Sequence, residues 1–136
     1  ICTSFKQEVL VGTHNFTNSS GNSFKLALYT SSATLGASST AFVTTGQATG
    51  TNYTSGGSAL TNVTPATSGT TAIVDFADLT FSNATVTARG CMIYNDTNSD
   101  KAVCVIDFGG DKTSTAGDFT IVFPAANATG AIIRLA

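Results

Sequence analysis

Charged side chains are scarce in this sequence. Only 10% of its 136 residues are Asp, Glu, Lys or Arg, whereas a soluble domain usually carries about a quarter. The six basic residues are scattered along the chain, and the formal net charge is −2. Because nucleic-acid binding needs Lys and Arg gathered on one surface, we expect no nucleic acid partner.

Long apolar runs are also missing. No stretch approaches the roughly 20 apolar residues that cross a bilayer as a helix, so we expect no membrane partner. No basic segment followed by an apolar one stands near Ile1, so no signal peptide is visible in the sequence. Three Cys and one His do not follow the spacing of a zinc site.

The sequence contains a single histidine, His14. A nucleophilic enzyme needs such a base beside a Ser or Cys, with a carboxylate to orient it. The spacing around His14 does not offer that set, and no Gly-x-Ser-x-Gly motif occurs. We expect a hydrogen-bonded His14 at the end of the first helix, and neither catalysis nor a cofactor.

Acidic residues give two weak metal-site patterns. The first has the spacing of loop positions 1, 3, 5 and 12 of a calcium-binding loop: Asp96, Asn98, Asp100 and Asp107. However, Lys101 stands where that loop needs Gly, and its last position lacks the bidentate Glu. The second brackets the segment Gly109–Gly117 and consists of Asp107, Asp111 and Asp118. We interpret both sets as solvated turn carboxylates and predict no metal.

Thr, Ser, Asn and Gly supply the polarity that charges do not. Thr favours strands, and Gly, Asn and Ser favour turns. One helix is predicted over Ser4–Leu10, with Ser4 and Gln7 as a capping box and Gly12 as its stop.

Alternating apolar residues predict about eight short strands: Phe24–Thr30, Ala59–Val63, Thr71–Phe76, Leu79–Phe81, Val86–Tyr94, Ala102–Phe108, Phe119–Phe123 and Ala131–Leu135. Turns are predicted at Pro65, Thr67–Gly69, Asn95–Asp100 and Gly109–Gly117. The pattern indicates a single domain, residues 1–136, that is an all-β antiparallel sandwich of jelly-roll type with one short N-terminal helix.

The polar segment Ser31–Gly57 is unusually long for a connection inside a compact domain. We expect one short strand within it, at Ala41–Thr45, and otherwise a loop that lies across the surface. Connections of this length are often functional.

The turn Asn95–Asp100 joins two strong strands. A four-residue loop would place Asn95 opposite Asp100 and Cys91 opposite Cys104. At that spacing the two cysteines form either a disulfide or a pair of buried thiols, and the lack of a signal peptide favours thiols. Both faces of this hairpin are apolar, so each needs cover, from a loop of the same chain or from another subunit.

Several strings in the chain resemble a group of small virion proteins of tailed bacteriophages: Phe24–Leu35, Asp75–Asp78, Thr87–Gly90, Ile93–Asn95, Asp107–Lys112, Phe119–Phe123 and Ala131–Arg134. The resemblance covers almost the whole chain. It implies a virion component, and it implies small apolar residues at the positions of Cys91 and Cys104, which argues against a required disulfide.

Size and surface favour one virion role, that of a capsid cement or decoration protein. Such a protein self-associates as a dimer or trimer, binds the major capsid protein on the outer surface of the capsid, and is assembled in the host cytoplasm. The alternatives are a tail, neck or fibre protein of the same virion, and a carbohydrate-binding adhesin module. The absence of Trp argues against the adhesin, because sugar sites favour exposed aromatic platforms. The likeliest contact surfaces in the sequence are Val86–Phe108 and Ser31–Gly57.

Overall fold

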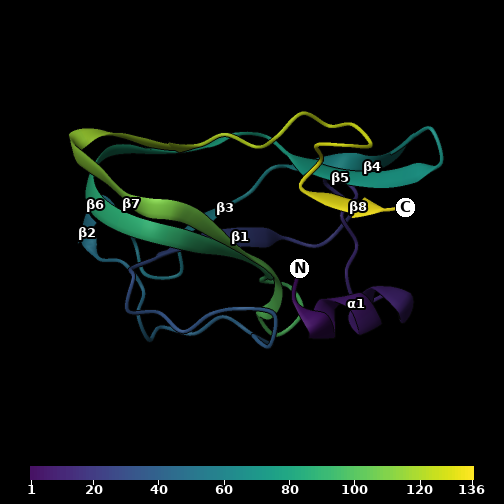
Figure 1. The fold of residues 1–136 in the computed structure, drawn as a ribbon, viewed down its shortest axis with the longest axis horizontal. Helices are drawn as coiled ribbons and strands as arrows, with labels where there is room; N and C mark the ends of the chain where they lie inside the picture. The colour runs from purple at the N-terminus through teal and green to yellow at the C-terminus, as the bar shows by residue number, and fades with distance from the viewer.

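One helix and eight strands make up the fold, in a computed structural model that describes all residues 1–136 (Figure 1). In chain order they are α1 (Thr3–Leu10), β1 (Phe24–Tyr29), β2 (Gly50–Thr51), β3 (Ser58–Ala59), β4 (Asn62–Ser68), β5 (Thr71–Phe76), β6 (Leu79–Asn95), β7 (Lys101–Ile121) and β8 (Ile133–Leu135). The helix is short, and no helix in the structure has the length and apolar character needed to cross a bilayer.

All strand pairs are antiparallel, and they form two sheets. One sheet has the order β2-β6-β1-β3, with β7 paired to the other edge of β6, and the second has the order β4-β5-β8. The predicted all-β class, the antiparallel sheets and the single N-terminal helix are confirmed. The jelly-roll topology stays a prediction.

Strands β6 and β7 are much longer than the sequence suggested. Leu79–Phe81 and Val86–Tyr94 are parts of one 17-residue strand, β6, and the segment Gly109–Gly117 lies inside the 21-residue strand β7. The turn predicted at Gly109–Gly117 is therefore wrong. Its glycines form bulges instead, with a φ of 80° at Gly109, so the strand bends without ending.

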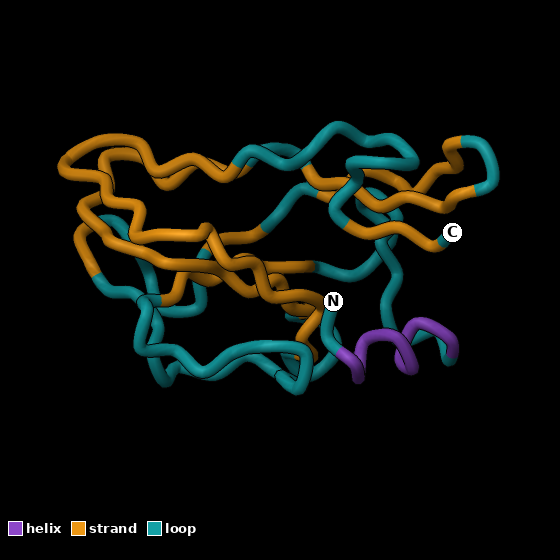
Figure 2. The backbone as a smooth tube through the Cα atoms, in the orientation of Figure 1, coloured by secondary structure: helices purple, strands orange, loops and turns teal.

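These bulges curl the β6–β7 ribbon from one layer of the sandwich into the other (Figures 1 and 2). The register shifts three times between Phe81 and Gly90 of β6. Two carboxylates hold the irregular backbone, since Asp107 accepts from the amide of Gly109 (2.8 Å) and Asp118 from the amide of Asn83 (3.3 Å). The β7 edge therefore passes through both layers.

The predicted hairpin register is also wrong. Ile93 pairs with Cys104 and Cys91 with Ile106, so the two cysteines are not directly opposite each other. The turn takes five residues, Asp96 to Asp100, because Asn95 accepts two turn amides and the last two turn residues have positive φ. A further shift between Tyr94 and Ile93 moves the pairing by one more residue, from Tyr94–Ala102 to Ile93–Cys104.

The long segment 31–57 covers one face of this hairpin and of β1, so the cover comes from the same chain. Phe42 stacks on Tyr94 with ring centroids 4.7 Å apart, and the Tyr94 hydroxyl donates to the Gly56 carbonyl (2.6 Å). The strand expected at Ala41–Thr45 is wrong, because only Ala41 makes a β-bridge, to Lys101. The carbonyl of Val43 accepts instead from the hydroxyl of Tyr29 (2.5 Å).

Three smaller predictions are corrected at element ends. The helix begins at Thr3 and its N-cap, Cys2, makes no side-chain cap, so the capping box is absent. Pro65 lies within β4 at a bulge, not at a turn, because proline is tolerated where the ladder is interrupted. The strand expected at Ala59–Val63 is split between β3 and β4. The helix stop at Gly12 is confirmed, and the turn predicted at Thr67–Gly69 is confirmed at its last residue only, because Thr67 and Ser68 still pair within β4.

An aromatic cluster fills the space between the two layers. Phe16 stacks on Phe24 with centroids 4.4 Å apart, and Phe76 contacts both rings. Phe76 also meets Phe123, which follows β7. These residues come from the N-terminal segment, β1, β5 and the chain after β7, so the cluster ties distant parts of the sequence into one core.

Gly57 tests the docking of the long segment on β1. A Cβ there would overlap the carbonyl of Leu26, and its φ of 80° disfavours any L side chain. We expect Gly57→Ala to lower the free energy of unfolding by about 2 kcal/mol or more, measured by urea denaturation. The control is Gly36→Ala, where a Cβ meets nothing within 4 Å. Equal stabilities of the two variants would contradict the packing of this segment.

Candidate functional site

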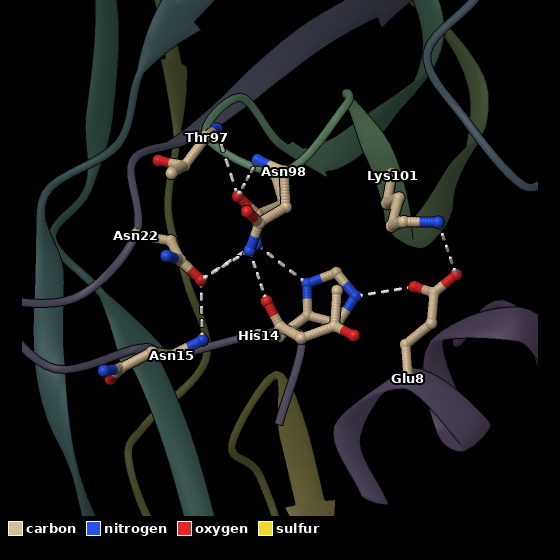
Figure 3. A network of polar contacts seen from close by, with 9 residues as sticks. Glu8, His14, Asn15, Asn22, Thr97, Asn98 and Lys101 are labelled. Carbon is tan, nitrogen blue, oxygen red and sulfur yellow. Dashed lines mark hydrogen bonds and ion pairs between the residues drawn. The ribbon is translucent and has the colours of Figure 1, made fainter. Parts of the chain in front are cut away.

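A buried polar network around His14 is the most elaborate side-chain constellation in the chain (Figure 3). The side chain of His14 has no exposed surface, and its Nε2 lies 2.7 Å from Oε2 of Glu8 on α1. Its Nδ1 lies 3.0 Å from the amide nitrogen of Asn95 at the end of β6. The expected hydrogen bond of His14 near the first helix is confirmed.

Asn95 fixes the tautomer of the imidazole. Its Oδ1 accepts from the backbone amides of Thr97 and Asn98, both at 3.1 Å. The amide group therefore turns its Nδ2 toward His14, where it donates to Nδ1. Nε2 then carries the proton and donates to the carboxylate of Glu8. A flip of Asn95 would break both turn bonds.

Two more side chains complete the network. Asn22 accepts from the amide of Asn95 at 3.1 Å, and it also accepts from the backbone of Asn15 at 2.8 Å. Lys101 places its Nζ 3.6 Å from the second oxygen of Glu8. The network thus joins α1 and the segment before β1 to the β6–β7 turn, which lies far from both in the sequence (Figure 3).

The arrangement resembles a base and its orienting groups, but it faces no nucleophile. The hydrogen-bond partners of His14 are a carboxylate and an amide, and both of its ring nitrogens are occupied. Neither Ser nor Cys stands within hydrogen-bond reach of the ring in this network. The geometry therefore serves to fix three segments together, a role in which each buried polar atom needs its partner.

The acidic residues of the two metal-site patterns are dispersed. Asp96 pairs with Lys25 at 3.5 Å, and Asp107 pairs with Arg89 at 3.2 Å. Asn98 donates to the backbone carbonyl of Thr13. The backbone amide of Gly109 and then Arg89 hold the pKa of Asp107 below its usual range. No three His, Cys, Asp or Glu side chains gather in a way that could hold a metal ion.

The second feature is an open mouth between the two layers on the β7 side. A pocket of about 520 Å³ lies there. Its apolar walls come from both halves of β7 and from the chain that follows: Ile106, Phe108, Phe119, Ile121, Val122, Phe123 and Ile132. Phe108 and Ile132 are only half-buried, so the core is not closed at this side.

The backbone edge beside this mouth is free over most of its length. The only backbone partners on the outer edge of β7 lie at its start, where Ala41 bridges Lys101 and the amide of Cys2 donates to Val103 (3.0 Å). From Cys104 to Ile121 the strand pairs only with β6. An apolar pocket that opens beside a strand edge without a neighbour is a candidate contact surface for another protein.

Sequence reasoning located these features in part. The hairpin Val86–Phe108 was expected to form a contact surface, but its flat faces are covered by the chain itself, and only its β7 edge is open. Val122, which is 72% exposed, stands between two inward-facing residues, Ile121 and Phe123. That alternation marks an outward apolar side chain and is visible in the sequence. No local pattern marks the partnership of Glu8, His14 and Asn95.

Comparisons with known proteins add no relative: no protein-family model, curated protein or solved structure matches this chain.

Asn95 is the centre of the polar network, so its removal should cost stability. Asn95→Ala leaves His14 Nδ1 and two turn amides without their partner, and we expect a loss of about 2 to 4 kcal/mol in the free energy of unfolding. The control is Gln7→Ala, an exposed helix position that makes no side-chain hydrogen bond. If Asn95→Ala lowered the free energy of unfolding by no more than Gln7→Ala does, the network would be dispensable for stability.

The cysteines give a prediction on reactivity. All three are free and buried, as the favoured thiol interpretation requires, and burial raises the pKa of the Cys104 thiol from 9.0 to about 12 and that of Cys91 as well. The thiols should resist a thiol reagent in the native chain at about pH 8 and all react once the chain is denatured without reductant. One reactive thiol after denaturation would instead reveal a disulfide.

The same shifts predict a loss of stability in alkali. Because the unfolded chain releases the Cys104 proton near pH 9.0 and the folded chain only near 12, the folded state is favoured fully below pH 9.0. Burial also raises the pKa values of Tyr29 and Tyr53 from 10.0 to about 12. We expect the free energy of unfolding, measured by denaturant titration, to fall progressively over that range. A flat profile would contradict the burial of these groups.

Proposed function

We propose that this chain is a structural virion protein that binds the outer surface of a bacteriophage capsid, contacts the major capsid protein and stabilises the shell through self-association. The role is that of a cement or decoration protein, and the proposal includes no catalytic step. The sequence resemblance to small tailed-phage virion proteins motivates the virion assignment. The β-sandwich fold is compatible with it.

The observation that carries the proposal is the open β7 side of the sandwich. There the chain leaves an apolar pocket, an unpaired strand edge and the exposed side chain of Val122 on one face. Apolar surface gathered beside an open pocket is a place where another protein can dock. The chain therefore carries a contact face, while its polar network is internal.

The rest of the surface suits repeated shallow contacts. Thr, Ser and Asn side chains lose less on desolvation than ionised groups do, provided that they find hydrogen-bond partners. Pairs such as Thr80–Thr120 (3.0 Å) and Thr87–Thr113 (2.9 Å) line the exposed side of the ribbon. Each copy then needs to make only a modest contact with the shell, because copies that associate with one another bind with added avidity.

Co-sedimentation tests this function. Purified chain is mixed with expanded capsids that lack it, and the bound amount is measured after centrifugation. We expect saturable binding at a fixed number of copies per capsomer and greater resistance of the capsids to heat. An unrelated β-sandwich domain of similar charge is the control. Failure to bind the shell, or binding to isolated tails alone, would overturn the cement role.

A further inference from the structure

We propose that the open β7 side of the sandwich is a twofold interface with a second copy of this chain, in which Val122 of each copy enters the apolar pocket of the other. The inference rests on the self-association in the proposed function and names the surface that performs it. We call this surface the β7 face, defined as the pocket lining together with the free edge from Cys104 to Ile121.

The β7 face carries both a projection and a cavity. Val122 is 72% exposed at the rim, and the pocket of about 520 Å³ beside it is larger than one valine side chain. Within one copy Val122 cannot fill this space, because Ile121 and Phe123 on either side of it point into the core. A twofold axis through such a surface places the projection of each copy over the cavity of the other.

The charges on the rim fit the same symmetry. Lys112 and Asp118 both line the pocket, both are exposed, and neither forms an ion pair within the chain. A twofold axis through the face would bring Lys112 of one copy toward Asp118 of the other, twice. Opposite charges placed in this way fix the register of an interface more than they add affinity.

The bulges of β7 favour this face-to-face contact over continuous strand pairing. Edge strands interrupted by bulges and charges do not add a long neighbouring strand, and β7 curls at Gly109 and again at Ala116. A side-chain contact over the mouth avoids that obstacle. A stable pair needs about 800 Å² from each partner, which is roughly an eighth of the 6839 Å² that the chain exposes.

Sedimentation velocity over a concentration series tests the interface with the full chain. We expect a dimer that Val122→Asp weakens by about a hundredfold in dissociation constant, since a carboxylate would enter an apolar pocket. Leu10→Asp is the control, because Leu10 is 85% exposed on α1, away from the β7 face. A wild-type chain that is monomeric at about 100 µM, or that forms a trimer, would overturn the proposal.

Charge reversal separates the interface from a general loss of folding. Lys112→Asp and Asp118→Lys should each weaken the dimer by about tenfold, because each homodimer then places like charges together twice. A mixture of the two variants should restore association, since each contact in the mixed dimer joins opposite charges. Lys6→Asp, an exposed change on α1, is the matched control. Absence of rescue in the mixture, with both variants folded, would overturn the pairing.

The two proposals fail in different ways. If Val122→Asp leaves the dimer intact but abolishes co-sedimentation with capsids, the β7 face docks on the shell and this inference is overturned. If the dimer behaves as expected and no form of the chain binds capsids, the inference stands and the cement role is overturned.

Discussion

The antiparallel pairing between β6 and β7 is the interaction on which the rest of the structure depends. It runs from Leu79–Ile121 at one end to Asn95–Lys101 at the other. Because of its bulges, the ribbon bends, so the same two strands run through both layers and the inner faces of the layers meet (Figure 1). Without these bulges the ribbon would be straight, and Phe119 and Phe108 would not face each other across the mouth, with centroids 6.3 Å apart.

The same ribbon determines which surfaces are used internally and which stay free. Its turn end is held by the Asn95–His14–Glu8 network and covered by segment 31–57, so the hairpin faces are taken by the chain itself. Its outer edge has no strand beside it after Val103. The curl that closes the core therefore leaves one side of the sandwich open, and the contact face that we propose follows from the fold rather than from an added element.

Much of the fold could be predicted from sequence because alternation of apolar residues records burial directly. Phe24–Tyr29 and Thr71–Phe76 alternate or run apolar, and they are strands with nearly the predicted ends. The turn predicted at Gly109–Gly117 was wrong because glycine permits a bulge as readily as a turn. Only the pairing with a neighbouring strand decides between the two. The predicted register of the two cysteines was wrong for a related reason, since the five-residue turn depends on hydrogen bonds that Asn95 accepts from the amides of Thr97 and Asn98.

The candidate site was less accessible from sequence. In this network His14 and Asn95 are 81 residues apart in the chain, and no local spacing encodes such a contact. The open mouth depends on the curvature of β7, which arises from several bulges acting together. The exposed Val122 was the one local sign of it. Long-range pairing and accumulated twist are properties of the assembled sheet, so they appear only in three dimensions.

We propose that the chain works as a component of an assembly, placed on the outside of a capsid. The position and copy number of the chain in the intact particle test this proposal most directly, by electron cryomicroscopy of particles with and without the protein. We expect added density at many symmetry-related positions over the seams between major capsid protein subunits. Density confined to the tail, or a particle that contains none of the chain, would contradict it.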